Sequence, residues 1–447
     1  MLGNVSCEAL FSGDEQEALM AKQLNYNGTS VVDAILNSPD SFETRTFETA
    51  IECRPIGISS EHFSNCFSCA TVQKLFGFFQ TLSDEERNYP IAYAMLVHKD
   101  VAQVLMLLSA IYQPQNQFCI AVDGNSDEKF WRTITELARC YPNIQVFRAK
   151  KIEWCSFEII EAIFECVVRL SKSPIQWRYI QILSGVDAPL KTNLEMVRIF
   201  KALNGSFNTE VLPFERYRLH GKRARNSPLP LVKSSLAAVF SREAADFMSN
   251  NEVVHKQLVF LNGTVCADES LWATIAGNPD SNACITELPM PGGFKAKEFL
   301  LRTFGTNFSK WWFRAHIGPW MTRSNSSEET TPNGEFRIDN YVVSRYQQWL
   351  IRSNSNCRGS CIQVSPLQVF HHKTPGRYYR LSCIFGVDDL PTLVKRHELV
   401  AHKLYLDFQP AAFLCLLQEI RRRSLHPVPF TAAGYDSLPK GPVWNKN

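Results

Sequence analysis

Polar residues follow two expected strands of the chain at the points where those strands end. Ile91–Val97 is an apolar run that ends at His98–Lys99–Asp100, and Phe118–Val122 is a second apolar run followed by Asp123. Between them, apolar residues at positions 104, 105, 108 and 111 recur at helical spacing, and Pro114 ends that helix. Ligands of open α/β sheets bind outside the carboxyl ends of the strands. The pattern therefore predicts a nucleotide-type pocket, and an ordinary edge loop is the alternative.

A second candidate for chemistry is the segment from Asp268 to Thr274, which reads DESLWAT. It should begin a helix, with Asp268 as the N-cap. Glu269 then lies in the first turn, where a carboxylate complements the positive end of the helix dipole. On composition alone, this structural role of Glu269 is favoured over a catalytic one.

An alternating pattern of strands and helices from Tyr89 onward is able to position these residues. Strands are expected at 91–97, 118–122, 144–147 and 178–184, and helices at 101–112, 127–139 and 156–170, with a last amphipathic helix at 413–423. Such alternation predicts an α/β fold with a mainly parallel sheet and helices on both faces. Residues 1–88 are polar and irregular, so we expect a stem and lead-in there and one large domain over 89–447.

Composition indicates a globular protein of a secretory compartment. The net charge of +3 with 20% charged residues gives no reason to expect nucleic acid as a partner. The chain has 14 cysteines, and Asn-x-Ser/Thr glycosylation signals occur at Asn4, Asn27, Asn204, Asn262, Asn307 and Asn325. Dispersed cysteines together with many such signals favour an oxidising compartment. A cytosolic protein with reduced thiols is the alternative.

The N-terminus does not look like a targeting segment. Met1–Ser12 has neither a basic region nor an apolar run, so it is not a signal peptide. The richest apolar run, Val101–Tyr112, is shorter than the roughly 18 residues that a membrane span needs.

Seven ordered segments resemble one known family. They read AYAMLVHKD, YQPQNQFCIAVD, QILSGVDAPLKTN, FSRE, ADESLWATI, YYRLSCIFGVDDL and LVAHK. They are similar to the core-2 and I-branching β-1,6-N-acetylglucosaminyltransferases, glycosyltransferase family 14. The resemblance implies a GT-A-type nucleotide-sugar-binding fold and a catalytic domain at 89–447.

The activity implied by the resemblance is inverting, metal-independent transfer of GlcNAc from UDP-GlcNAc in β1,6 linkage onto an O-linked glycoprotein glycan. Xylose or glucose as the donor sugar stays open, as does a catalytically inactive glycan-binding relative. Family members are type II Golgi proteins, so a Golgi-lumen location is implied. The membrane would then be contacted only through an N-terminal anchor that this chain lacks.

The resemblance assigns the catalytic base and the diphosphate ligands. Glu269 matches the family's base, which a sugar hydroxyl needs because it is a poor nucleophile; such a base is worth about 10² to 10⁴ in rate. The sequence contains no Asp-x-Asp metal motif. Arg380 and Lys403 match the two basic residues that neutralise the diphosphate in the family, so no metal cofactor is expected.

The nucleotide is expected at the strand ends. Val97 and His98 match the first uridine-contacting segment of the family, and Asp123 follows the second strand. Trp154 aligns with an aromatic residue, usually Tyr, that supports the uracil. Stacking needs only a π face, so Trp is able to replace it; plain core packing of Trp154 is the alternative.

Acceptor recognition matches the family less well. In the loop Asn208–His220, strict alignment places Asn208 on the family's glutamate, Arg216 on its lysine and Leu219 on its arginine. Glu210 and Arg218 are the alternatives after a small shift. Trp349 matches a later tryptophan, whereas Ile351 replaces a tyrosine, which leaves the acceptor's identity open.

The resemblance also implies a partial disulfide framework. It pairs Cys7 with Cys415, Cys119 with Cys166, Cys140 with Cys53 in preference to Cys66 or Cys69, and Cys383 with Cys361 or Cys357. Sequence alone does not fix connectivity. A Cys266–Cys284 bridge is a further possibility, and Cys155 is expected to be a buried free thiol.

Three other motifs are set aside. His397 and His402 resemble a zinc-binding helix but stand five residues apart, and at about 100° per residue they point to different helix faces. His371–His372 are expected to be polar loop residues. The basic cluster Arg216–Arg225 is expected to be solvated or to face a sugar. No metal site is therefore predicted.

Overall fold

The computed structural model is built around a six-stranded sheet with the strand order β3-β2-β1-β4-β9-β6. It describes residues 2, 5–26, 69–205, 207–210, 212–229, 231–276, 342–347 and 382–436. The neighbours β3 (Ile144–Arg148), β2 (Gln117–Val122), β1 (Ile91–Val97) and β4 (Tyr179–Ser184) are parallel. β9 (Ala238–Ser241) and β6 (Asn208–Thr209) continue the sheet by antiparallel pairing. The predicted α/β fold with a mainly parallel sheet is confirmed.

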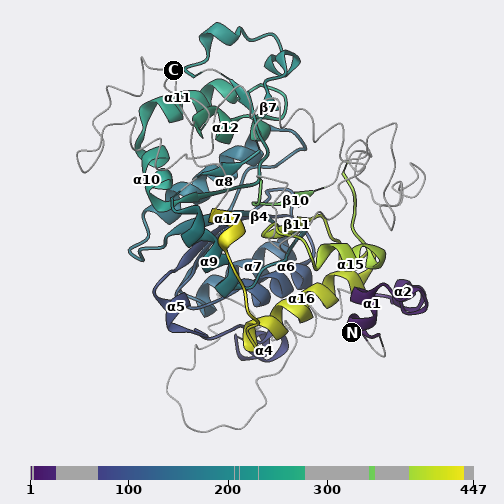
Figure 1. The fold of residues 1–447 in the computed structure, drawn as a ribbon. Helices are drawn as coiled ribbons and strands as arrows, with labels where there is room; N and C mark the ends of the chain where they lie inside the picture. The colour runs from purple at the N-terminus through teal and green to yellow at the C-terminus, as the bar shows by residue number, and fades with distance from the viewer. Residues whose placement is uncertain are drawn as a thin grey trace, which may run out of the picture.

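Helices cover both faces of this sheet (Figure 1). Alternate residues of β1 point to opposite faces, so Tyr93 and Met95 join one apolar core while Ala92 and Ala94 join the other. The first core is closed by α6 (Val101–Ile111), α7 (Glu128–Cys140), α9 (Asn193–Leu203) and α16 (Pro410–Leu425). The second is closed by α8 (Phe157–Ser171), α10 (Arg242–Asn250), α11 (Glu252–Leu261) and α12 (Leu271–Ala276).

A small sheet with the strand order β10-β11-β5 lies beside the carboxyl end of β4. Its strands are β10 (Tyr346–Gln347), β11 (Val400–His402) and β5 (Asp187–Pro189). β5 follows β4 after a two-residue turn, so this sheet carries residues from the distant C-terminal part of the chain to the edge where ligands of α/β folds bind.

Shorter elements complete the described structure. They are α1 (Cys7–Ser12), α2 (Glu15–Lys22), α4 (Cys69–Phe76), α5 (Asp84–Arg87), β7 (Leu212–Pro213), η1 (Arg216–Leu219), η2 (Ala224–Asn226), β8 (Val232–Lys233), η3 (Ala267–Glu269), η5 (Val387–Asp389), α15 (Leu390–Leu393) and α17 (Ala433–Asp436). Among the described residues, no helix is both long and apolar enough to cross a membrane.

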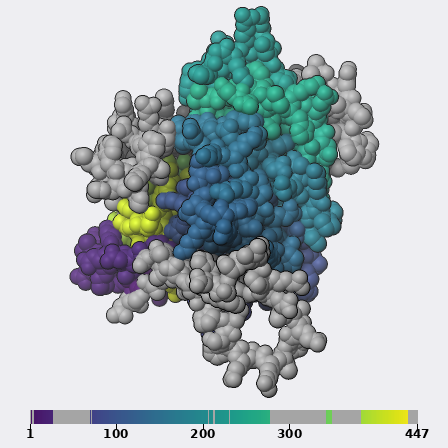
Figure 2. Space-filling model, turned by 180° about the vertical axis from the view of Figure 1, so that it is seen from behind, coloured from purple at the N-terminus to yellow at the C-terminus, as the bar shows by residue number. Residues whose placement is uncertain are grey.

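Disulfide bonds tie the N-terminal elements to the large domain. The predicted bonds Cys7–Cys415 and Cys119–Cys166 are both confirmed. Cys7–Cys415 joins α1 to α16, and the N-terminal segment in purple lies against the C-terminal segment in yellow (Figure 2). The buried pair Cys119–Cys166 joins β2 to α8.

The predicted partner of Cys140 is wrong, because Cys140 pairs with Cys69 and not with Cys53. Cys69 begins α4, which lies beside the end of α7: the Tyr141 hydroxyl donates to Gln73 Oε1 at 3.3 Å. Cys383 is disulfide-bonded. Its expected partners Cys361 and Cys357 lie outside the described residues, as does Cys53.

The expected helix start at Asp268 is also wrong. Residues 267–269 form the 3₁₀ turn η3, and the α-helix α12 begins at Leu271. Asp268 Oδ1 is buried without a hydrogen-bond partner, so this side chain does not cap the helix.

Candidate active site

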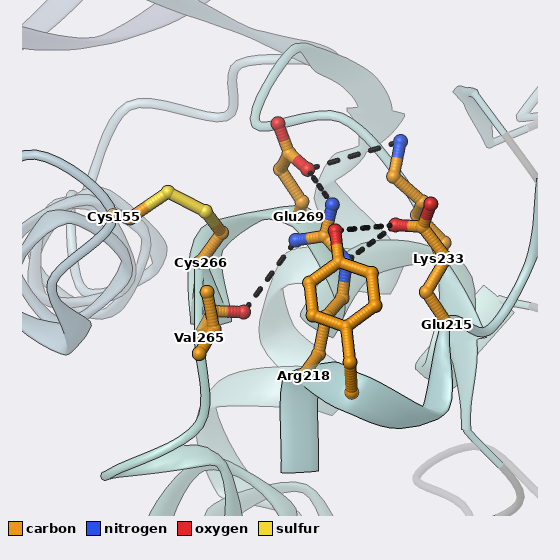
Figure 3. The surroundings of a disulfide bond; sticks show 8 residues. Cys155, Glu215, Arg218, Lys233, Val265, Cys266 and Glu269 are labelled. Carbon is orange, nitrogen blue, oxygen red and sulfur yellow. Dashed lines mark hydrogen bonds and ion pairs between the residues drawn. A yellow bond between two sulfur atoms is a disulfide. The ribbon is translucent and has the colours of Figure 1, made fainter. Parts of the chain in front are cut away.

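Glu269 lies in an ion-paired cluster formed by three segments that are distant in the sequence (Figure 3). Its Oε2 accepts a hydrogen bond from Arg218 Nη2 at 2.6 Å and lies 3.8 Å from Lys233 Nζ. Arg218 Nε pairs with Glu215 at 2.7 Å. The Arg218 side chain is 6% exposed and that of Glu269 is 23% exposed. Solvent therefore reaches the Glu269 carboxylate, while the cation that holds it is buried.

The remaining residues of the Asp268–Thr274 motif position this carboxylate. Trp272 is fully buried, and its Nε1 donates to the Leu236 carbonyl oxygen at 3.0 Å. The Thr274 hydroxyl accepts from the Val232 N–H at 2.9 Å and donates to the Val232 carbonyl oxygen at 3.1 Å. These bonds fix α12 to residues 232–236, which carry Lys233. The motif thus places both Glu269 and one of its two cationic partners.

Asp268 lies beside Glu269, and its Oδ1 atom is buried. Removal from water, and then the negative charge of Glu269, raise the pKa of Asp268 to about 7. Two adjacent carboxyl groups therefore occupy different environments, and Glu269 is the one beside the cations.

In the loop Asn208–His220, which was expected to bind the acceptor, the structure favours different residues from those chosen by strict alignment. Asn208 is buried in β6, where its Oδ1 accepts from the N–H groups of Val343 and Ser344 at 3.0 and 3.2 Å. Arg216 is exposed at the start of η1, and Glu210 is partly buried. Arg218, the shifted alternative, is the residue that reaches Glu269. Trp349, and Ile351 with it, lie outside the described residues.

The expected donor residues at the strand ends lie together. The Asp123 N–H donates to the Val97 carbonyl oxygen at 2.9 Å, and Ser126 Oγ donates to the His98 carbonyl oxygen at 2.9 Å. Asp123 Oδ1 accepts from the Asn125 and Ile152 N–H groups at 2.9 and 3.0 Å. This oxygen of Asp123 therefore joins the loop after β2 to the loop after β3.

Trp154 lies in the loop after β3 and is 56% exposed. The alternative that it packs in the core is therefore wrong. The neighbouring Cys155 is not a free thiol, because it forms a disulfide with Cys266. The Cys266–Cys284 bridge is wrong for the same reason. Cys266 stands three residues before Glu269, so this bond connects the Trp154 loop to the turn that carries the expected base (Figure 3).

Lys403 follows β11 in a basic environment beside the carboxyl ends of β1 and β4. Removal from water, and then the guanidinium of Arg345, lower the pKa of Lys403 to about 8. Arg345 is itself held by the fully buried Asp187, at 2.9 Å, whose other oxygen accepts from His402 Nδ1 at 2.7 Å. Removal from water, then the charges of Lys99 and Lys403, also lower the pKa of His98, against an opposing effect of Asp123. A concentration of cations at a strand-end edge suits an anionic group such as a diphosphate.

A family model matches the part of the chain that carries Glu269. Residues 91–299 match the model described as "Branch: Core-2/I-Branching enzyme". The matched residues include β1 to α12 and with them Glu269. The family is one of glycosyltransferases, and the resemblance predicted from the seven sequence segments is confirmed.

Curated relatives also match the chain outside residues 91–299. The human β-1,3-galactosyl-O-glycosyl-glycoprotein β-1,6-N-acetylglucosaminyltransferase is 26% identical over 419 residues, which cover 89% of this chain and 86% of the relative. A rat enzyme with the same name and the number 3 is 25% identical over 444 residues, covering 95% and 84%. A Bovine herpesvirus 4 protein with the unnumbered name is 26% identical over 367 residues, covering 77% and 71%.

Several residues of the site were not found from the sequence. Asp187 and His402 stand within the segments that carry the family resemblance, so a signal for them was present. Lys233 and Arg345 stand outside those segments, and only the folded chain brings them to Glu269 and Lys403. Arg380, the other expected diphosphate ligand, lies outside the described residues.

Proposed function

We propose that the protein is an inverting glycosyltransferase that moves GlcNAc from UDP-GlcNAc in β1,6 linkage onto an O-linked glycan of a glycoprotein. The observation that carries the proposal is the solvent-reached carboxylate of Glu269, held by the buried Arg218 inside a branching-enzyme domain. The names of the human and rat relatives support GlcNAc as the transferred sugar, the β1,6 linkage and an O-glycosyl glycoprotein as the acceptor.

In this reaction, Glu269 accepts the proton of the acceptor's 6-hydroxyl. The hydroxyl oxygen attacks the anomeric carbon from the face opposite the diphosphate, and UDP leaves with the electron pair of the broken glycosidic bond. Arg218 and Lys233 hold the carboxylate in place before attack. A base positioned in this way typically contributes about 10² to 10⁴ in rate.

The leaving diphosphate needs positive charge, and we assign this role to Lys403 and Arg380, with no divalent metal. The absence of an Asp-x-Asp motif from the sequence supports this assignment. The Lys403 ammonium group, with Arg345 beside it, supports it from the structure. Val97, His98, Asp123 and Trp154 are assigned to the nucleotide side, and Glu210, Arg216 and Trp349 remain assigned to the acceptor side.

We further propose a Golgi-lumen location with type II membrane topology, with residues 1–88 as stem and lead-in and 89–447 as the catalytic domain. The disulfide bonds support an oxidising compartment. Two glycosylation signals, at Asn204 and Asn262, have exposed asparagines. A mobility shift after removal of N-glycans from the secreted protein would test this assignment.

The decisive experiment measures UDP release with a panel of UDP-sugars and a core-1 O-glycan acceptor in the presence of EDTA. We expect turnover with UDP-GlcNAc that EDTA does not reduce, and a decrease of about 10² or more in kcat for Glu269→Gln. Faster turnover with UDP-xylose or UDP-glucose would assign that sugar as the donor in place of GlcNAc. Equal turnover of wild type and Glu269→Gln would remove Glu269 from the mechanism, and activity restored only by Mn²⁺ would exclude the metal-free reaction.

A further inference from the structure

A disulfide bond joins two turns that carry residues of the proposed site. Cys155 lies two residues before α8, and Cys266 lies immediately before η3, at a sequence separation of 111. Neither cysteine belongs to the bonds that fasten the N-terminal elements to the large domain. Its position between Trp154 and Glu269 suggests a role in the reaction and not only in stability.

On the base side, Cys266 belongs to the backbone that holds both members of the Arg218–Glu269 pair (Figure 3). Its carbonyl oxygen accepts from the Glu269 N–H at 3.0 Å. The preceding Val265 donates its N–H to the Arg218 carbonyl oxygen at 2.8 Å and accepts from Arg218 Nη1 at 3.4 Å. A displacement of Cys266 therefore moves the carboxylate and the cation that orients it.

On the donor side, Cys155 belongs to a loop that is fixed to the end of β2. The Ile152 N–H donates to Asp123 Oδ1 at 3.0 Å, and the Ile152 carbonyl oxygen accepts from Asn125 Nδ2 at 2.9 Å. Gly124 lies so close to this loop that a Cβ there would stand 2.8 Å from backbone atoms of residues 149–151. The loop that carries Trp154 is therefore held in a fixed position relative to the end of β2.

The backbone at both cysteines needs an external constraint. Cys155 and Cys266 have φ values of 59° and 51°, in the left-handed region that residues with a Cβ adopt only at a cost. Two constraints link the turns directly at the cysteines: the disulfide, and a hydrogen bond from the Cys266 N–H to the Cys155 carbonyl oxygen at 3.1 Å. Without the covalent bond, both turns are able to relax, and Glu269 moves with them.

We propose that the Cys155–Cys266 disulfide is a positioning element for catalysis, which holds Glu269 and Arg218 in register with the donor-side loop. The inference rests on the proposed function, in which Glu269 is the base. The disulfide acts through Glu269 and does not itself contact the substrate.

The test compares two double variants, Cys155→Ser/Cys266→Ser and the control Cys69→Ser/Cys140→Ser. The control bond spans a similar separation, 71 residues against 111, so loss of either bond should lower the melting temperature by a comparable amount. Only the first variant should lose kcat, by about tenfold or more, because small misplacements of catalytic groups have effects of this size. Its UDP dissociation constant, measured by calorimetry, should change by less than about twofold. Equal kcat values for the two folded variants would overturn the proposal.

A double-mutant cycle separates this inference from the proposed function. In a Glu269→Gln background, loss of the Cys155–Cys266 bond should not lower kcat further, because the group that it positions is gone. A further loss of about tenfold would show that the bond does not act through Glu269. Wild-type turnover by Glu269→Gln alone would instead reject the proposed function.

If the serine variant does not fold, graded reduction of the folded wild-type protein tests whether activity depends on the Cys155–Cys266 bond. Cys155 is partly exposed, as are Cys7, Cys69 and Cys140, whereas Cys119 and Cys166 are buried, so each reductant dose must be mapped bond by bond. Alkylation and peptide mapping at each reductant dose should show activity falling in step with modification of Cys155 and Cys266. Activity that falls in step with another pair, or alkylation of both cysteines before any reductant is added, would contradict the proposal.

Discussion

At the scale of single residues, the site separates two kinds of positive charge. Arg218 and Lys233 lie against the Glu269 carboxylate, where they are already paired with an acid. Lys403 lies near the strand ends with Arg345, which is itself paired with the buried Asp187, and the positive charge of Arg345 lowers the pKa of Lys403. A cation cluster whose members repel one another favours an added anion, so the two groups of charge are expected to respond differently to UDP.

The variants Lys403→Ala and Glu269→Gln should therefore give different kinetic patterns. In the proposed mechanism, Lys403→Ala removes a charge that faces the diphosphate in both the ground state and the transition state, so this variant should weaken UDP binding and slow turnover. Glu269→Gln should leave UDP affinity nearly unchanged while kcat falls by about 10² or more. Calorimetric UDP titration beside steady-state kinetics measures both, with Lys403→Arg as the charge-conserving control. If Lys403→Ala binds UDP as tightly as wild type, the diphosphate site is elsewhere.

UDP affinity should also fall as the pH rises from 7 to 9. Burial and Arg345 lower the pKa of Lys403 to about 8, so the lysine is mostly protonated at pH 7 and mostly neutral at pH 9. The UDP phosphates are already ionised over this range, because the second phosphate pKa is about 6. A loss of up to about tenfold in affinity follows if only protonated Lys403 binds. Lys403→Arg should flatten the profile, and an equally steep profile in that variant would assign the titration to another group.

The sequence analysis could select only site candidates that stand inside recognisable motifs. Glu269 and Lys403 both stand in short segments that carry the family resemblance. Arg345 does not, and it reaches Lys403 only because β10 pairs with β11. The preference for Cys53 over Cys69 had no physical basis in the sequence, since connectivity depends on where α4 packs.

At the scale of elements, the strands could be predicted closely because burial on both faces leaves a continuous apolar run. The β1 prediction matches its observed bounds, Ile91–Val97, and the β2 prediction begins one residue late. The helix after Cys266 could not be placed as well. Its first turn is 3₁₀, and an N-cap residue type at Asp268 gives no indication that the carboxyl group is buried beside another acid.

The small sheet should depend strongly on the buried carboxylate that joins its three strands. Asp187 of β5 pairs with Arg345 beside β10 and with His402 of β11, and its side chain is fully buried. Asp187→Ala leaves the Arg345 guanidinium buried and uncompensated, so it should lower the free energy of unfolding by about 3–5 kcal/mol in urea denaturation.

The surface pair Glu252–Lys256 gives the matched control for that measurement. Its side chains are 81% and 62% exposed, so Glu252→Ala should change stability little. A small effect for both variants would mean that Asp187 contributes little to the stability of the small sheet.

Loss of Asp187 should also lower the pKa of Lys403 further, because the carboxylate favours the protonated lysine.

At the scale of the whole molecule, a disulfide bond joins the two ends of the described chain far from Glu269. Cys7–Cys415 fastens α1 to α16, with a sequence separation of 408. α16 packs in the core that contains α6, α7 and α9, on the sheet face opposite α12. α1 packs against α2 and α15 and is joined to α16 by the disulfide, whereas the Glu269 cluster is formed by residues 215–218, 233 and 269. Loss of this bond should therefore lower the stability of the protein without lowering its kcat.

Cys7→Ser/Cys415→Ser should lower the free energy of unfolding by about 2–5 kcal/mol, because the bond restricts the unfolded chain over a very long loop. Since the bond lies away from Glu269, the kcat of the folded variant should stay close to the wild-type value at a temperature well below its melting point. Urea denaturation followed by tryptophan fluorescence measures the first quantity, and UDP release measures the second. A decrease in kcat as large as that of Cys155→Ser/Cys266→Ser would mean that any loss of covalent restraint loosens the site. The position of a disulfide relative to Glu269 would then not matter, and catalysis would depend on the rigidity of the whole fold.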